Sequence, residues 1–467
     1  MTISGASTEV RHFCEDYDEF APGPTRERHR AQEVQRFVPP KPRPWLQNLT
    51  LIVNDVVGLT LGSFKFGPVR PVIPHDAVQK LRAIPPDAGN VLVGPHPGTH
   101  DPFLLYHLYR VAGKVPAAIL MASESFYNRG WMKRAMMRSV GVMPVVRGRK
   151  NPEAVDYVTE RLADGKWCGL FPEGEMYYSR EVMPMEYGAL RLAVEAAIKV
   201  RQRAARLGRR DVGQRPVLVT PFAHVYFFRN HERTLRETKD ALTELEQRPE
   251  VFGKQQQGDL ITRLRSVADR LLEYRAEQYG VPQEVWSGPD RFARADRLKT
   301  YVLEQLERRY QGAVAQGYVR RRALKVRMTI YEILGRSTGN VAETEALQLD
   351  LQKTRDIVMA VPFSRDYLNK YGDLEMWVEY LRRFRSVLKM PDPDLGSQEA
   401  IFRVMPSIDA HPLAAHYESL PSQDARMEFL FDKTDELRKS IQSGVDEICW
   451  AHPRSKMTPA NDVPAKF

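Results

Sequence analysis

The sequence predicts an α/β fold class, a mixed sheet flanked by helices, followed by a large all-helical C-terminal extension. Between about residues 70 and 230, short apolar runs alternate with stretches of helical periodicity, a pattern typical of strands and helices that alternate along the chain. From residue 231 onward, leucines recur at three- and four-residue spacing within long charged segments, which indicates amphipathic helices. In a sheet of the first kind, functional residues are expected at the ends of the strands.

The N-terminal part should form two segments. Residues 1–44 are polar and end in the proline cluster FVPPKPRPW, so we expect a polar linker or tail. In the following WLQNLTLIVNDVVGL, apolar residues including Trp45, Leu49 and Ile52 fall at helical spacing, which predicts an amphipathic helix. This helix either docks on the next domain or anchors the protein at a lipid interface with Trp45 at headgroup level. We therefore assign 45–230 to the α/β domain with its leading helix, and 231–467 to a helical extension of unknown role.

The α/β domain should contain at least five strands and four helices. The strand candidates are the runs VLVGP, AAILMA, MPVV, WCGLF and VLVTPF, and the helix candidates span residues 102–113, 130–139, 152–164 and 187–207.

Composition indicates a folded protein that meets anions. The 467 residues carry a formal net charge of +10, which favours phosphates, coenzymes, lipid headgroups or nucleic acid as partners. Cys14, Cys168 and Cys449 lack C-x-x-C spacing, so neither a disulfide framework nor a zinc ribbon is predicted, and a reducing cytoplasm fits best. Because we find neither a signal peptide nor about 18 consecutive apolar residues, we expect a cytoplasmic protein with at most peripheral membrane contact.

The stretch VLVGPHPGTHDPF holds the strongest candidate for chemistry. Pro97 and Gly98 disfavour a helix directly after His96, whereas Asp101 and Pro102 are typical of a helix start. The two side chains can therefore meet across the turn. A carboxylate bonded to one imidazole nitrogen fixes the tautomer and leaves the other nitrogen as a base. Since the stretch has no serine nucleophile, the pair suits direct deprotonation of a hydroxyl that attacks an activated acyl group.

Three further stretches have unremarkable interpretations when taken singly. SVGVMPVVRGRK ends a predicted strand at Arg147, GLFPEGEMYYSR places a tight turn after another strand, and VLVTPFAHVYFF resembles a buried strand that contains Pro221. In this order and spacing, however, the four stretches resemble the motif set of the glycerolipid acyltransferase family, which includes the lysophosphatidic acid and glycerol-3-phosphate acyltransferases. HPGTHD is similar to the family's His-x4-Asp block, and MEYGALRLAVEA to the segment that follows its third block. The resemblance covers about residues 70 to 230.

The resemblance implies an O-acyltransferase of phospholipid or wider lipid metabolism. It assigns His96 as general base and Asp101 as its partner, places Arg147 near an acceptor phosphate, and lets the loop of Phe171, Pro172, Glu173 and Gly174 shape the acceptor site. The fatty acyl group would come from a thioester, acyl-CoA or acyl carrier protein, and pass to a hydroxyl of a glycerolipid, lysophospholipid or related lipid. This chemistry requires no metal or redox cofactor, since the donor is already activated.

The sequence departs from the family pattern at the acceptor motif. FPEG is usually followed by Thr-Arg-Ser, but here Glu175, Met176 and Tyr177 follow it, and Pro95 and Gly98 flank His96 where the family has Asn and a small polar residue. The missing arginine is thought to help hold an acceptor phosphate, so the resemblance leaves the acceptor's identity open. Arg180 is a candidate to supply the charge.

Other functions remain as alternatives. In one alternative, the α/β domain is a catalytically weakened lipid-binding platform, and the helical half is a partner-binding module. A zinc site of His96, His100 and Asp101 is disfavoured by the Pro-Gly pair. The basic stretches at 199–215 and 318–327 are either solvated helix faces or surfaces that attract anionic lipid or coenzyme phosphates. Nucleic-acid binding is not expected, because no recognition motif accompanies these charges.

Overall fold

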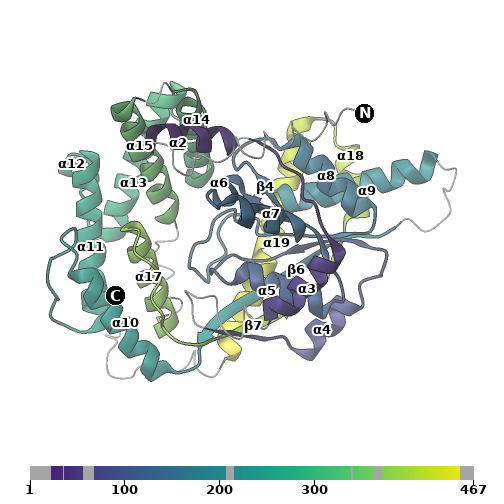
Figure 1. Cartoon of the computed structure of the whole chain (residues 1–467), viewed down its shortest axis with the longest axis horizontal. Coiled ribbons are helices and arrows are strands. Elements are labelled where there is room, and N and C mark those ends of the chain that lie inside the picture. Colours follow the sequence, from purple (N-terminus) through teal and green to yellow (C-terminus); the bar gives the residue numbers. More distant parts are fainter. Residues whose placement is uncertain are drawn as a thin grey trace, which may run out of the picture.

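The computed structural model describes residues 23–34, 36–55, 68–206, 215–337, 340–361, 370 and 372–452. A mixed sheet with helices on both faces lies beside a group of long helices (Figure 1). The predicted fold class is confirmed in its main features, a mixed α/β sheet and a large helical region after it.

Eight strands form the sheet within the described residues. They are β1 (Val69–Val72), β2 (Gly89–Val93), β3 (Pro116–Ala122), β4 (Val142–Val145), β5 (Trp167–Leu170), β6 (Val217–Phe228), β7 (Gln398–Val404) and β8 (Ile408–Asp409). The order is β1-β7-β6-β2-β5-β3-β4, and β8 pairs with β6. Strands β2 to β5 and the first half of β6 run parallel, so their carboxyl ends meet at one edge. All five predicted strands are present.

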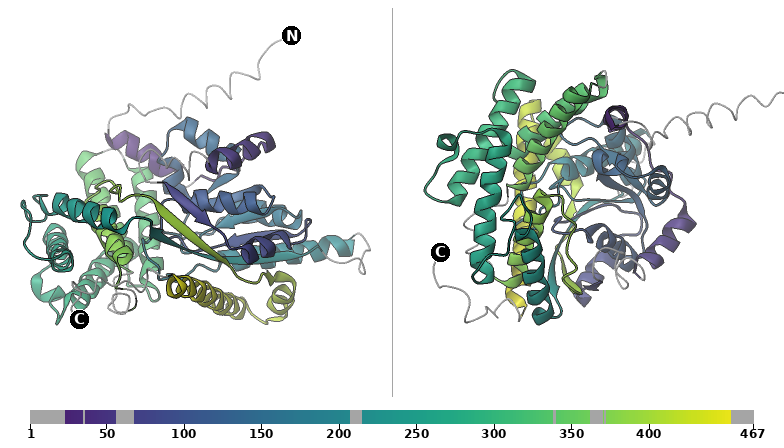
Figure 2. Two further views of the ribbon diagram at one scale, coloured as in Figure 1. Left: turned by 90° about the horizontal axis from the view of Figure 1, so that it is seen from below. Right: turned by 60° about the vertical axis from the view of Figure 1, so that its left-hand side comes forward.

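Helices cover both faces of the sheet, which is why its central strands are mostly apolar (Figure 2). On β2, Val91 and Val93 enter one core and Leu92 enters the other. One face is covered by α8 (Pro152–Ala163), α9 (Gly188–Arg206), α18 (Ala410–Ser419) and α19 (Gln423–Ala451), and the other by α3 (Pro44–Val53), α4 (His75–Arg82), α5 (Asp101–Val111), α6 (Ser123–Tyr127) and α7 (Trp131–Ser139). The four predicted helices of the domain are α5, α7, α8 and α9.

The helical region has cores of its own. Its helices are α10 (His231–Glu246), α11 (Leu260–Tyr279), α12 (Gln283–Trp286), α13 (Arg291–Gln311), α14 (Val319–Arg336), α15 (Val341–Met359) and α17 (Leu374–Val387). Several begin at an Asp or Asn whose side chain accepts a bond from the first turn, as Asp259 and Asn340 do. One core contains side chains of α12, α13, α14 and α15, and another contains side chains of α10, α11 and α17.

The prediction that residues 231–467 are all helical, and separate from a domain ending at residue 230, is wrong at 398–409. There the chain returns to the sheet: β7 pairs in parallel with β1 and antiparallel with β6, and β8 pairs with β6. The buried positions of β7 alternate with partly exposed ones. This period of two is the mark of a strand, but the run is short and stands between long helical segments.

The predicted polar tail is also corrected in part, because α2 (Gly23–Glu33) is a helix that packs on the helical region. Ala31 is buried in the same core as α14, and the Gln32 side chain donates to the Gly335 backbone carbonyl at 2.7 Å. Among the described residues, the structure contains no helix long and apolar enough to cross a membrane.

Candidate active site

The loop that leaves β2 brings His96 and Asp101 together at the carboxyl edge of the sheet. Residues 94–100 form no regular structure, and α5 begins at Asp101. His96 Nδ1 lies 2.6 Å from Asp101 Oδ2. The His96 side chain keeps 21% of its surface exposed, whereas the Asp101 side chain is fully buried. The expected contact across the turn is therefore formed, with the remaining imidazole nitrogen, Nε2, on a ring that solutes can reach.

Asp101 is the centre of a larger network. Besides His96, its carboxylate accepts hydrogen bonds from the Gly98 backbone N–H at 2.8 Å, from His224 Nε2 at 2.8 Å and from the Tyr226 hydroxyl. Burial by itself would raise the pKa of Asp101, but the two histidines outweigh it and hold the pKa well below its usual range. The carboxylate is therefore ionised at neutral pH, with both oxygens fixed in place.

Sequence reasoning missed His224 and Tyr226, which lie on β6. They occupy alternate positions of VLVTPFAHVYFF and so point to the same face of the sheet. Three polar side chains on one face of a mostly apolar strand, those of Thr220, His224 and Tyr226, were the signal that could have found them. Their approach depends on Gly98, because a Cβ there would lie 2.8 Å from the Tyr226 ring.

The loop after β5 packs on the other side of His96. The Phe171 ring stacks on the imidazole, with ring centroids 4.5 Å apart. Glu173 is buried and accepts bonds from the His96 backbone N–H at 2.7 Å and from the Met183 N–H at 2.9 Å. The Pro172 carbonyl accepts from the Glu186 N–H. Glu173 thus fixes the backbone of the residue whose side chain faces the site.

Burial raises the pKa of Glu173 to about 7, against bonds from His96 and Met183 that lower it. In the folded protein the carboxyl therefore stays protonated from about pH 4.5 to 7, whereas in the unfolded chain it ionises. Since the unfolded state then binds fewer protons, stability should fall as pH rises through this window, by roughly 3 kcal/mol. Glu173→Gln should remove that fall, measured as the free energy of unfolding at pH 5 and pH 8. Glu195→Gln, at a partly exposed residue outside the loop, serves as control. An unchanged difference in Glu173→Gln would contradict the assignment.

Arg147 follows β4 and reaches the same loop. Its guanidinium donates to the Gly174 carbonyl, lies 2.5 Å from Glu175 Oε1 and lies 3.1 Å from Glu124 Oε1. Burial would lower the pKa of Arg147, but these two carboxylates raise it overall. Gly174 has φ of +68°, a conformation that favours glycine, and a Cβ there would lie 2.8 Å from Arg320 Nη1.

The helical region therefore contributes directly to this loop through α14. Arg320 pairs with Glu186, and Arg327 pairs with Glu175 at 3.0 Å. Sequence reasoning placed Arg320 and Arg327 only in a basic stretch.

Arg180, the candidate to replace the family's missing arginine, does not reach back to residues 171–175 of the loop after β5. It forms two bonds to Asp373 at the start of α17 and is buried there.

All seven residues proposed from the sequence for catalysis and substrate binding lie together at the carboxyl edge of the sheet, joined by the contacts above.

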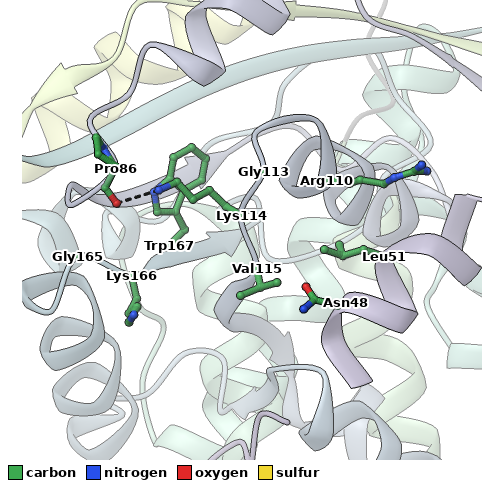
Figure 3. Close-up of a pocket in the computed structure, with 10 residues that line it drawn as sticks. All are labelled: Asn48, Leu51, Pro86, Arg110, Gly113, Lys114, Val115, Gly165, Lys166 and Trp167. Atoms are coloured by element: carbon green, nitrogen blue, oxygen red, sulfur yellow. Dashed lines mark hydrogen bonds between the residues drawn. The ribbon is translucent and has the colours of Figure 1, made fainter. Parts of the chain in front are cut away.

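The structure also shows a hollow of about 460 Å³, but at the opposite edge of the sheet. Its lining residues include Lys114 and Val115, which directly precede β3, and Lys166 and Trp167, at the start of β5 (Figure 3). Lys114 donates to the Pro86 carbonyl there. None of its lining residues belongs to the His96 network. In the described part of the chain, no group of three or more His, Cys, Asp or Glu is arranged to hold a metal ion.

The fold and the site together define an α/β domain with a buried carboxylate and a reachable imidazole at the carboxyl edge of its sheet. Residues 76–225 match the family model described as Acyltransferase. This segment runs from α4 to β6 and contains every residue of the predicted site. By this match, residues 76–225 form an acyltransferase-like domain, and the predicted resemblance to acyltransferases is confirmed for that segment. No solved structure was found to match the chain.

Proposed function

We propose that this protein transfers a fatty acyl group from an acyl thioester to the hydroxyl of a lipid alcohol, with His96 as general base. The observation that carries the proposal is the Nδ1–carboxylate contact of 2.6 Å between His96 and Asp101. It favours the tautomer in which Nδ1–H donates to Asp101, so that Nε2 keeps a lone pair. Phe171 and Glu173 hold the ring and its backbone from the other side.

The reaction follows from this arrangement. His96 Nε2 takes the proton of the acceptor hydroxyl while its oxygen attacks the thioester carbonyl. Asp101 stabilises the imidazolium that forms. The carbon–sulfur bond then breaks, and the imidazolium returns the proton to the leaving thiolate, so that one ester and one thiol are formed. The thioester on coenzyme A or acyl carrier protein supplies the activation, and no cofactor takes part.

The test is to incubate the purified protein with labelled acyl-CoA or acyl carrier protein and a panel of lysolipids, glycerol phosphate and neutral alcohols. Mass spectrometry should show one labelled ester and an equal amount of free thiol. The alternative, a lipid-binding platform without catalysis, predicts binding to vesicles but no ester with any acceptor. The intact His96–Asp101 pair favours the enzyme, since a platform needs no oriented base.

We also propose that the protein works in the cytoplasm at the surface of an anionic membrane. Two helices on one face of the sheet expose apolar side chains to solvent: Trp45, Leu49, Ile52 and Val53 on α3, and Trp131, Met132 and Met136 on α7. The segment that leads into α3 is bonded to the end of α7, from Arg43 N to the Ser139 carbonyl at 2.9 Å. Lys41, Arg43 and Lys133 are exposed beside these residues. Exposed aromatic and apolar groups beside basic ones are typical of peripheral membrane contact.

Replacing Trp45 and Ile52 together by serine should weaken vesicle binding by at least tenfold, because each apolar side chain contributes about 1.5–3 kcal/mol when buried. Trp45 is 64% exposed, so the fold should tolerate the change. Flotation with vesicles of phosphatidylglycerol and phosphatidylethanolamine measures the effect. Trp450 on α19 is 62% exposed, and Trp450→Ser is the matched control that should bind normally. Equal loss in both variants, or no loss in either, would remove this surface from the proposal.

A further inference from the structure

The arginines around the loop that follows β5, residues 171–175, already form ion pairs with carboxylates of the chain itself. Arg147 lies against Glu124 and Glu175, and Arg327 shares Glu175. The three side chains Arg147, Glu124 and Glu175 are at least four-fifths buried. The two arginines lower the pKa of Glu175 to about 2, although burial acts in the opposite sense. Glu175 is therefore ionised at any physiological pH.

The second pairing at this loop is of the same kind. Arg320 and Arg321 of α14 share Glu186, at 2.5 Å and 2.8 Å. Together the four arginines face three carboxyl groups, those of Glu124, Glu175 and Glu186. Glu173 lies in the same place and adds a fourth acidic group that is half ionised near pH 7. The loop thus holds little or no excess positive charge.

An acceptor that carries a phosphate group would need an excess of positive charge at this loop. Moving a charged group from water into a mostly buried site is costly unless it gains an unmatched partner of opposite charge. Here a phosphate at Arg147 would have to displace Glu175 or lie beside it as a second anion. Within the part of the chain that the structure describes, Arg320 Nη1 and Arg327 Nη2 are buried and have no hydrogen-bond partner. Each can donate to a neutral oxygen acceptor such as a hydroxyl or an ester carbonyl.

We infer that the acceptor is an uncharged lipid alcohol, and that Glu175 sets this specificity by occupying Arg147 and Arg327. The inference rests on the proposed acyl transfer and deepens it. Arg147 then serves to position the loop through Gly174 and Glu175, and the polar groups of a neutral acceptor meet Arg320 and Arg327.

The test compares two acceptors that differ by one phosphate, 1-acylglycerol and 1-acylglycerol 3-phosphate of equal chain length, with the same acyl-CoA. We expect kcat/KM to favour the neutral acceptor by at least 100-fold. Glu175→Gln keeps the shape but removes the charge, and it should reduce this preference at least tenfold. Equal use of both acceptors by the wild type, or a preference for the phosphorylated one, overturns the inference.

Calorimetric titration with glycerol 3-phosphate separates this inference from the proposed function, because it requires no turnover. The wild type should show no binding, and Glu175→Gln should gain binding. Glu307→Gln is the control: Glu307 is buried and doubly bonded to Arg322, so the net charge changes equally at an ion pair outside the loop. Glycerol 3-phosphate binding to the wild type, with or without ester formation, refutes a neutral acceptor. Absence of ester from every acceptor refutes only the proposed function.

Discussion

His96→Gln should lower kcat/KM for acyl transfer by about 10³-fold, within the range of 10² to 10⁴ that general bases usually contribute. Glutamine can still donate a hydrogen bond toward Asp101, but its amide does not take a proton from the acceptor hydroxyl. Because the His96 side chain lies partly at the surface, the variant should fold normally. Initial rates with labelled acyl-CoA measure the effect.

The control for His96 is His416→Gln on α18, where the side chain is exposed and outside the network. It should keep the wild-type rate. If His96→Gln has native circular dichroism and undiminished turnover, the histidine is not the base, and the mechanism proposed above is wrong.

Asp101→Asn should be similarly severe, with a loss of about 10³- to 10⁴-fold in kcat. The carboxylate accepts from four donors. An amide offers one accepting oxygen and turns its NH₂ group toward either His96 or His224. If it faces His96, the imidazole takes the wrong tautomer and presents a proton instead of a lone pair. If the NH₂ group faces His224, two buried donors, the NH₂ group and His224 Nε2–H, point at each other and neither has an acceptor there.

Asp101→Asn should also cost about 1–3 kcal/mol of unfolding free energy, because a buried donor loses its acceptor. Chemical unfolding measures this loss separately from kcat of the folded enzyme. Tyr226→Phe is the companion variant, since it removes one donor to Asp101 but leaves the His96 contact. A loss of stability with normal kcat in Asp101→Asn would reduce Asp101 to a purely structural role.

Much of the α/β domain could be predicted because its signals are local. Strands such as Gly89–Val93 and Trp167–Leu170 are buried on both faces and appear as short apolar runs. The meeting of His96 with Asp101 followed from a Pro-Gly turn and a helix start, both encoded within six residues. The gathering of Arg147 and Glu173 at the same edge follows from the parallel direction of β4 and β5.

The features that escaped prediction depend on contacts between distant segments. His224 and Tyr226 lie more than 120 positions from Asp101, and nothing near them in the sequence names their partner. The same holds for Arg320 and Arg327, whose helical periodicity predicts only a basic face of α14. Periodicity gives the faces of an element, but which faces meet is decided by packing over the whole chain.

The position of β7 has a consequence for how the protein is made. This strand lies between β1 and β6, yet it emerges from the ribosome about 170 residues after β6, because β6 ends at Phe228 and β7 begins at Gln398. Until then β1 lacks its parallel neighbour and β6 exposes an unpaired edge, which invites association with other nascent chains. A fragment that stops at residue 230 contains His96, Asp101, His224 and Tyr226, but its sheet lacks β7 and β8.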